Sequence, residues 1–176
     1  MKPRDKTRGD LTPAAAYDTA IRLLGRRGHG RRELQLKLRQ RGYAEAAIDE
    51  ALTRCEAHNY IDEAATCESY CRELIRKGRG PRAIRQRLAQ RGFDRGLIDA
   101  TLAAHYPATA IQATARAVAD RKADQLKARH KAAGDLRTRL ARFLTQRGFP
   151  SDVVHQAIDH TMEAAPREGG LDRDGR

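Results

Sequence analysis

The sequence has no tryptophan and few other aromatic residues. Five tyrosines and three phenylalanines make up 5% of its 176 residues, while 40% are hydrophobic and 33% are charged. With this balance we do not expect one large core. Aromatic and β-branched side chains, which favour strands, are few beside Ala, Leu, Arg, Gln and Glu, which favour helices. The composition therefore predicts an all-α fold.

Cysteines and long apolar runs are scarce as well. The three cysteines are an odd number, and the first residues lack the apolar core of an export signal, so we expect reduced thiols and no disulfide framework. No stretch approaches the roughly 18 consecutive apolar residues of a membrane span. These absences predict a cytoplasmic protein that does not enter the membrane.

Motifs of catalysis are also missing. The sequence contains no phosphate loop, no nucleophile motif, no glycine-rich dinucleotide turn and no His-Glu-x-x-His frame. Asp62 and Glu63 form a carboxylate pair, but they stand where a helix is expected to begin, which favours a capping role. We expect no enzymatic activity and no cofactor.

A zinc site is the one metal site that the sequence allows in principle. Cys67 and Cys71 share a helix face, and Cys55 and His58 are nearby in sequence. The spacing is not that of a Cys-x-x-Cys zinc knuckle, however, and the two helix cysteines coincide with an apolar stripe, where cysteine behaves as a small hydrophobic residue. We therefore expect no metal.

Positive charge exceeds negative charge strongly. Lys and Arg number 35 against 23 Asp and Glu, which gives a net charge of +12 and an isoelectric point near 10.2. A basic composition indicates a polyanionic partner such as nucleic acid. The alternative is that the arginines reflect only a GC-rich genome.

A repeated tetrapeptide is the most informative pattern. Gln-Arg-Gly-aromatic occurs at 40–43, 90–93 and 146–149, so the glycines are 50 and 56 residues apart. Apolar residues recur four and eight positions before each glycine, and six and ten positions after it, which places one helix on each side. They are Leu34, Leu38, Ile48 and Leu52; Ile84, Leu88, Ile98 and Leu102; Leu140, Leu144, Val154 and Ile158. Each glycine is expected to end a helix in the left-handed conformation.

A further helix precedes each pair. Thr12 and Pro13 predict the start of the first one. Asp62 caps the second, whose buried stripe is expected to comprise Cys67, Tyr70, Cys71, Leu74 and Ile75. The third is longer, roughly 109–131, with a weak apolar face of Ile111, Ala115, Val118 and Leu126. We expect the aromatic of each tetrapeptide to pack inward, and Asp94 to cap the helix that follows Phe93.

These elements predict nine helices in three tandem three-helix repeats. The expected boundaries are 13–58, 59–107 and 108–165, with flexible segments at 1–12 and 166–176 that have little to bury. Repeats that contact chiefly their neighbours leave a long surface. We therefore expect an elongated, curved molecule, a shape better suited to a groove or filament than to a small-molecule pocket.

Several of these residues resemble the signature of a known family. Residues 59–63 read Asn-Tyr-Ile-Asp-Glu, followed by Tyr70, by Lys-Gly-Arg-Gly at 77–80 and by Arg-Gly-Phe at 91–93. This run is similar to the middle repeat of the RecX regulators, and the resemblance extends over about 17–162. The chain departs from the family pattern at Asn59, where glycine is usual, at Cys67 and Cys71, and in its third repeat, which lacks the Gly-x-Gly break.

The resemblance implies a modulator of the RecA recombinase. Such a protein lies in the groove of the RecA–DNA filament and restrains ATP hydrolysis, strand exchange and co-protease activity in recombination and the SOS response. The implied partners are the RecA filament and the single- or double-stranded DNA within it, and we expect a monomer. The sequence itself supports only the physical means, which is an extended cationic helical surface.

Basic side chains recur at equivalent positions. Lys37 and Arg41 align with Arg87 and Arg91, each pair four residues apart on one helix face. Arg79, Arg82 and Arg85 surround the start of the helix that follows Gly80, where free N–H groups would also favour an anion. The predicted partner- and DNA-binding residues are Lys37, Arg41, Arg79, Arg82, Arg85, Arg87, Arg91, Arg116, Arg121, Lys122, Lys127, Arg129 and Lys131. The alternative is an ordinary solvated face.

Two other functions remain open at this point. The chain could bind DNA alone, with its repeats acting as helix-turn-helix-like readers, although few exposed aromatics are expected for stacking on single strands. It could also be a protein scaffold whose charge is incidental.

Overall fold

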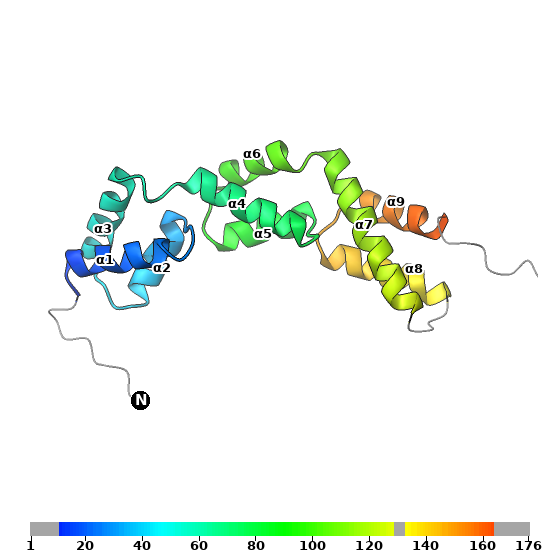
Figure 1. Ribbon diagram of the computed structural model, residues 1–176, viewed down its shortest axis with the longest axis horizontal. Coiled ribbons are helices and arrows are strands. Elements are labelled where there is room, and N and C mark those ends of the chain that lie inside the picture. Colours follow the sequence, from blue (N-terminus) through cyan, green and yellow to red (C-terminus); the bar gives the residue numbers. More distant parts are fainter. Residues whose placement is uncertain (1–10, 129–132, 164–176) are drawn as a thin grey trace, which may run out of the picture. The chain divides into compact units, whose positions relative to one another are not determined.

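The computed structural model describes residues 11–128 and 133–163 of the chain. Within these ranges the chain forms nine α-helices and no strand (Figure 1), which confirms the all-α prediction. The helices are α1 (Pro13–Leu24), α2 (Arg31–Arg39), α3 (Glu45–Ala57), α4 (Glu63–Arg76), α5 (Pro81–Gln90), α6 (Arg95–His105), α7 (Ala108–Lys127), α8 (Ala133–Gln146) and α9 (Ser151–Glu163). The predicted end segments lie outside the described residues, except for Leu11 and Thr12.

Side-chain caps begin three of the helices at the predicted residues. The Thr12 hydroxyl accepts a hydrogen bond from the Ala15 N–H at 3.2 Å. The carboxylate of Asp62 accepts one from the Ala65 N–H at 2.8 Å, and that of Asp94 accepts one from Gly96 at 2.7 Å. Each cap satisfies an N–H that has no partner inside its own helix.

The repeated glycines end helices as expected. Gly42, Gly92 and Gly148 have φ values of 85°, 89° and 86°, a region that costs a residue with a Cβ about 1–2 kcal/mol. The aromatic residue that follows each glycine then donates its N–H to the carbonyl of the buried leucine five residues earlier, at 3.3–3.4 Å. The chain therefore reverses at the same point of every repeat.

The apolar frame around these glycines forms the core. All twelve of its side chains are at most 4% exposed, and Tyr43, Phe93 and Phe149 are at most 5% exposed, so the aromatics pack inward as predicted. The stripe predicted for α4 is only partly right. Cys67 and Cys71 are fully buried, but Tyr70, Leu74 and Ile75 are half-buried.

The long helix α7 has 20 residues and ends at Lys127. The sequence predicted that it continues to about residue 131, and residues 129–132 lie outside the described part of the chain. Ala115, Val118 and Leu126 of its apolar face are buried, and Ile111 is partly buried against the same cluster. The predicted face is confirmed.

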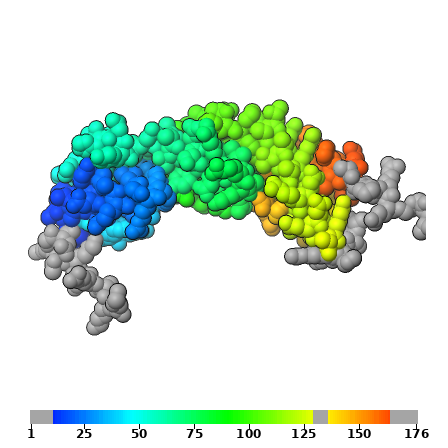
Figure 2. Space-filling view, in the orientation of Figure 1, coloured from blue at the N-terminus to red at the C-terminus, as the bar shows by residue number. Residues whose placement is uncertain are grey.

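The chain divides into two compact units. Unit 1 holds the residues up to Glu73 together with Arg85–His105, and unit 2 holds Leu74–Ile84 together with the residues from Tyr106 onward. In unit 1, α1 lies against α3 around one apolar cluster, and this three-helix domain is closely packed in the space-filling view (Figure 2, dark blue to cyan). In unit 2, α7 lies against α9 around another. The elongated, curved form concerns the arrangement of these units and stays a prediction.

Within unit 2, the turn before α9 packs against the start of α5. The Gly80 N–H donates to the Arg147 carbonyl at 2.8 Å, and the Arg82 N–H donates to the Gly148 carbonyl at 3.1 Å. A Cβ on Gly80 would lie 2.4 Å from the Gly148 carbonyl group, which leaves room for glycine only. The expected anion site on free N–H groups at the start of α5 is therefore wrong, because backbone carbonyls use those donors.

Unit 1 repeats this arrangement one repeat earlier. A Cβ on Gly92 would lie 2.6 Å from Cβ of Arg32, and one on Gly30 would lie 3.1 Å from Cε1 of Phe93. A carboxylate also lies at the start of α2, where the Arg31 N–H donates a hydrogen bond to Glu63 at 2.8 Å. Glu63 therefore caps a helix of the preceding repeat, so the capping role predicted at the start of α4 is confirmed for Asp62 only.

Candidate nucleic-acid interface

The structure places the predicted basic residues in different surroundings. Arg129 and Lys131 lie outside the described residues. Arg82, Arg87, Arg116 and Lys127 are exposed, and their side chains form no hydrogen bond or ion pair with any residue that the structure describes. These four are therefore available to an external anion.

Other predicted residues are engaged inside unit 1. Lys37 Nζ lies 4.0 Å from a Glu33 carboxylate oxygen, and the Arg41 guanidinium donates to the Lys37 carbonyl at 2.7 Å. Arg85 Nε donates to Asp99 at 2.7 Å. An external partner would have to compete with these contacts.

Arg91 belongs to a network that joins the first two repeats. Its guanidinium lies 3.9 Å from the centre of the Tyr70 ring and 3.4 Å from Glu33. Arg27 hydrogen-bonds both Glu33 and the Tyr70 hydroxyl, which in turn donates to the Gly28 carbonyl at 2.8 Å. Burial acts to raise the pKa of Glu33, but the Arg27 hydrogen bond and the charges of Arg27, His29 and Arg91 hold it below its usual value. Arg91 therefore stabilises unit 1 in addition to any role in binding.

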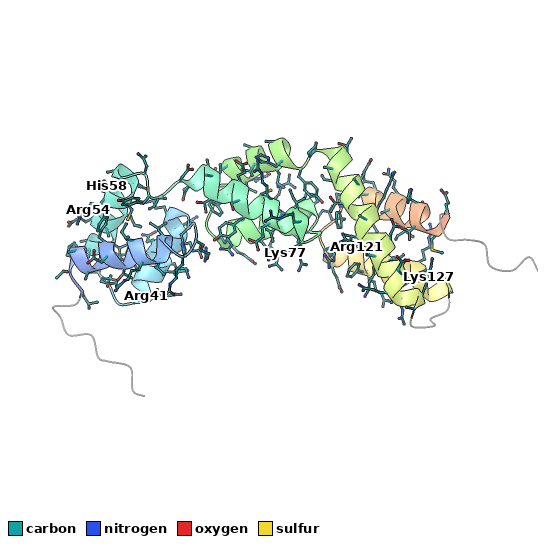
Figure 3. All side chains as sticks on the ribbon, viewed as in Figure 1. Arg41, Arg54, His58, Lys77, Arg121 and Lys127 are labelled. Carbon is teal, nitrogen blue, oxygen red and sulfur yellow. The ribbon has the colours of Figure 1, made fainter. Side chains whose placement is uncertain are left out.

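Several positively charged side chains line one cleft in unit 2. The cleft has a volume of about 290 Å³ and lies between the end of α4, one face of α7 and the end of α8. Figure 3 labels two of its lining residues, Lys77 directly after α4 and Arg121 on α7. Its lining residues are Arg76, Lys77, Gly78, Val118, Arg121, Lys122, Gln125, Phe143 and Arg147. None of these is acidic, so the cleft is suited to an anion.

Aromatic stacking and backbone carbonyls hold the cations of this cleft, hereafter the cationic cleft. Arg147 donates to the carbonyls of Lys77 and Gly78 at 2.7 and 3.1 Å, and its Cζ lies 4.6 Å from the centre of the Phe143 ring. Lys122 Nζ lies 5.0 Å from the same ring. These contacts of Arg147 and Lys122 use neutral partners, so they do not cancel the two positive charges.

Burial and neighbouring positive charges both act on the guanidinium of Arg147. Burial, together with the charges of Arg79 and Arg121, lowers the pKa of its guanidinium. A bound anion would relieve the repulsion between these charges.

Sequence reasoning missed Arg76, Lys77 and Arg147. Arg147 carried a signal, because it is the arginine of the third Gln-Arg-Gly turn and aligns with Arg41 and Arg91. Arg76 and Lys77 stand at the C-terminal end of a helix, where cations are common for reasons of helix stability alone. Only the packing of α4, α7 and α8 places them beside Arg121 and Lys122, the two predicted residues of the cleft.

The cysteines are buried thiols. Burial raises the pKa of all three, that of Cys71 to about 11, so they are poor nucleophiles at neutral pH. Among the residues that the structure describes, no group of three or more His, Cys, Asp or Glu is placed to hold a metal ion. No helix within the same ranges is long and apolar enough to cross a bilayer.

Family comparisons agree with the three-repeat organisation. Models of the first, second and third three-helix domains of RecX match residues 16–55, 62–102 and 110–158. Together these matches cover more than half of the chain. The chain belongs to the RecX family. Each matched range lies inside one of the three repeats expected from the sequence.

Curated members of the RecX family are similar over one stretch. The chain is 43% identical over 61 residues to the regulatory protein RecX of Chlorobium phaeobacteroides strain BS1, over 35% of this chain and 40% of that protein. It is 48% identical over 59 residues to the regulatory protein RecX of Pseudomonas entomophila strain L48, over 34% of this chain and 38% of that protein. The aligned part therefore spans about two fifths of these relatives.

Solved RecX structures share the fold over most of the chain. The crystal structure of RecX from Lactobacillus salivarius has a TM-score of 0.73 at 21% identity, covering 86% of this chain and 97% of that one. A second crystal structure of regulatory protein RecX has a TM-score of 0.72 at 23% identity, covering 90% of this chain and 81% of that one. At these identities the likeness shows the fold.

Proposed function

We propose that this RecX-family protein binds the RecA–DNA filament in the cytoplasm and lowers its activity in recombination and the SOS response. It does so by contact with the protein and the DNA of the filament and carries out no chemistry of its own. ATP hydrolysis, strand exchange and co-protease activity all require an active filament, so one bound regulator can reduce all three. No cofactor or metal takes part, and the chain acts as a monomer.

The cationic cleft is the observation that supports DNA contact most directly. A site lined by Arg76, Lys77, Arg121, Lys122 and Arg147 and by no carboxylate matches a phosphodiester backbone, and such contacts position a protein on DNA without reading its sequence. A regulator that acts wherever a filament forms must bind DNA of any base sequence. The exposed Arg82, Arg87, Arg116 and Lys127 are proposed as further contacts with DNA or with acidic surfaces of RecA.

The test is ATP turnover by preassembled RecA filaments on single-stranded DNA. We expect the purified protein to suppress turnover at substoichiometric amounts. Arg121→Glu should raise the concentration needed for half suppression by on the order of tenfold, because it puts a carboxylate into the cationic cleft. Arg142→Glu is the matched control, since Arg142 is also exposed in unit 2 but does not line the cleft.

Unchanged turnover with the wild-type protein would refute the filament proposal. If the protein then binds bare DNA tightly with a steep salt dependence, it is a stand-alone helical DNA-binding protein instead. If it binds neither DNA nor RecA, its charge is incidental. Equal effects of Arg121→Glu and Arg142→Glu would remove the cleft from the proposal while leaving the regulator in place.

A further inference from the structure

Tyr60 is unusually exposed for an aromatic residue. It is 52% exposed, and among the described residues the only other large hydrophobic side chain that is more than half exposed is Leu36, at 51%. Exposed aromatic surface of this kind is a common sign of a binding role when neighbouring aromatic side chains extend it. The Tyr60 ring lies beside the His58 ring, whereas the surface hollow that Leu36 lines contains no aromatic residue.

Tyr60 is the outer end of a row of rings on unit 1. The ring of His58 lies 5.6 Å from that of Tyr60 with an angle of 30° between their planes, and Tyr17 lies 6.5 Å from His58. Arg54 completes the row, with Cζ 4.0 Å from the centre of the Tyr17 ring. Figure 3 shows Arg54 and His58 at the end of α3, one turn apart. The row therefore combines three π faces with one cation.

The backbone fixes the position of Tyr60 in this row. Asn59 has a φ of 55°, the only positive φ of a non-glycine residue among those described. This turn lets the Tyr60 N–H donate to the Cys55 carbonyl at 2.8 Å, so that the chain folds back over the end of α3. Because this hydrogen bond already fixes the backbone at Tyr60, only side-chain freedom is lost when a ligand stacks on the ring.

We propose that Tyr60, His58, Tyr17 and Arg54 form a stacking platform for the unpaired bases of single-stranded nucleic acid. Aromatic faces bind bases of any sequence because every base has a π face, and an arginine adds a cation–π contribution. The bases of a duplex are already stacked on each other and cannot use the platform. The net charge of +12 supplies the long-range attraction to a polyanion.

This inference deepens the proposed function, since it assigns unpaired bases to unit 1 and leaves phosphates to the cationic cleft of unit 2. It needs no RecA and can be tested on the protein alone. The probe is a fluorescent oligo(dT) of about ten nucleotides, which matches the site sizes of single-strand binders. The comparison probe is an abasic oligonucleotide of equal length and charge.

The wild-type protein should bind oligo(dT) at least about fivefold more tightly than the abasic strand. Tyr60→Ala should remove this preference while leaving the affinity for the abasic strand unchanged, and Tyr60→Phe should keep the preference. Because the side chain is half exposed, the melting temperature should change little in either variant. A preference for oligo(dT) that survives in Tyr60→Ala overturns the platform, as does the lack of any preference in the wild type.

A second readout locates the stacked base. The chain contains no tryptophan, so Tyr60→Trp introduces a single reporter whose fluorescence a stacked base should quench. Leu36→Trp is the matched control, because Leu36 is equally exposed on unit 1 but lies outside the row of rings. We expect strong quenching by oligo(dT) at position 60 and little at position 36. Equal quenching at both positions contradicts the proposal.

The two proposals fail separately. If the wild type leaves RecA turnover unchanged but shows the Tyr60-dependent preference for oligo(dT), the filament function fails and the platform stands. If Tyr60→Ala weakens suppression of RecA turnover without any change in binding to either oligonucleotide, Tyr60 contacts protein instead, and the platform is refuted.

Discussion

The arginine that precedes the glycine of each repeated turn has different surroundings in each repeat. Arg41 donates to a carbonyl of its own helix, Arg91 lies on Tyr70 beside Glu33, and Arg147 donates to the carbonyls that follow α4. The same residue in the same local conformation is therefore a surface charge, a link between repeats, or part of an anion-binding cleft. Neighbours from other repeats decide which.

Cys71 allows a residue-scale prediction about pH. Burial raises the pKa of its thiol to about 11, against about 8.5 for an unfolded cysteine. Below about pH 8.5 both states hold the proton and the thiol makes its full contribution to stability. Between that pH and about 11 the unfolded chain releases the proton and the folded chain does not, so the free energy of unfolding falls as the pH rises.

The measurement is thermal melting between about pH 8 and 10.5. The wild-type melting temperature should decline across this range, and Cys71→Ala should decline less steeply, whatever its absolute stability. The variant removes one of three buried thiols, so part of the decline should remain. Identical slopes in the two proteins would show that Cys71 is protected less than its burial implies.

At the scale of elements, the second glycine of each Gly-x-Gly break marks a contact between repeats. Gly30 and Gly80 directly precede α2 and α5, and the turn of the following repeat packs against each of these helix starts. Gly42 differs from Gly92 and Gly148, because no atom lies within 4 Å of a Cβ added there.

This contact predicts that Gly80→Ala is strongly destabilising. A Cβ at Gly80 would lie 2.4 Å from backbone atoms of Gly148 and Phe149, which cannot move aside as a flexible side chain can. We expect a loss of about 1–3 kcal/mol and a melting temperature lower by several degrees.

Gly25→Ala is the matched control. Gly25 has a φ of −65° at the end of α1, and the nearest atom to an added Cβ would be 3.5 Å away. Alanine should be neutral there or should stabilise by about 0.4–1 kcal/mol. If the two variants melt at the same temperature, the close approach at Gly80 is not rigid.

At the scale of the whole molecule, charge determines how the protein responds to salt. A net charge of +12 and a cleft without carboxylates predict binding that depends on the release of counterions from DNA. If the protein contacts about six phosphates, its affinity for duplex DNA should fall by about a thousandfold between 50 and 200 mM salt.

The slope of this salt dependence tests the cationic cleft. Arg121→Glu should reduce the slope of log affinity against log salt by about one, while Arg142→Glu should leave it nearly unchanged. Fluorescence anisotropy with labelled DNA measures both. A shallow slope that neither substitution alters would mean that non-electrostatic contacts dominate the binding.

The sequence determined the helices and their core. The period of four residues on either side of Gly42, Gly92 and Gly148 identified all twelve apolar frame residues, and local chemistry placed the caps at Thr12, Asp62 and Asp94. These features depend on neighbours within about ten residues, which a sequence displays directly. The limits of this local reasoning were the half-buried Tyr70, whose hydroxyl is bonded to the first repeat, and the end of α7.

Tertiary structure decided what the surface residues do. It places Arg76, Lys77 and Arg147 in one cleft with the predicted Arg121 and Lys122. It also pairs Lys37 and Arg85 with acidic neighbours, and it places backbone carbonyls against N–H groups at the start of α5. These outcomes depend on groups from helices that are far apart in sequence. Charge acts through space, so the linear order of residues cannot show which charges end up together.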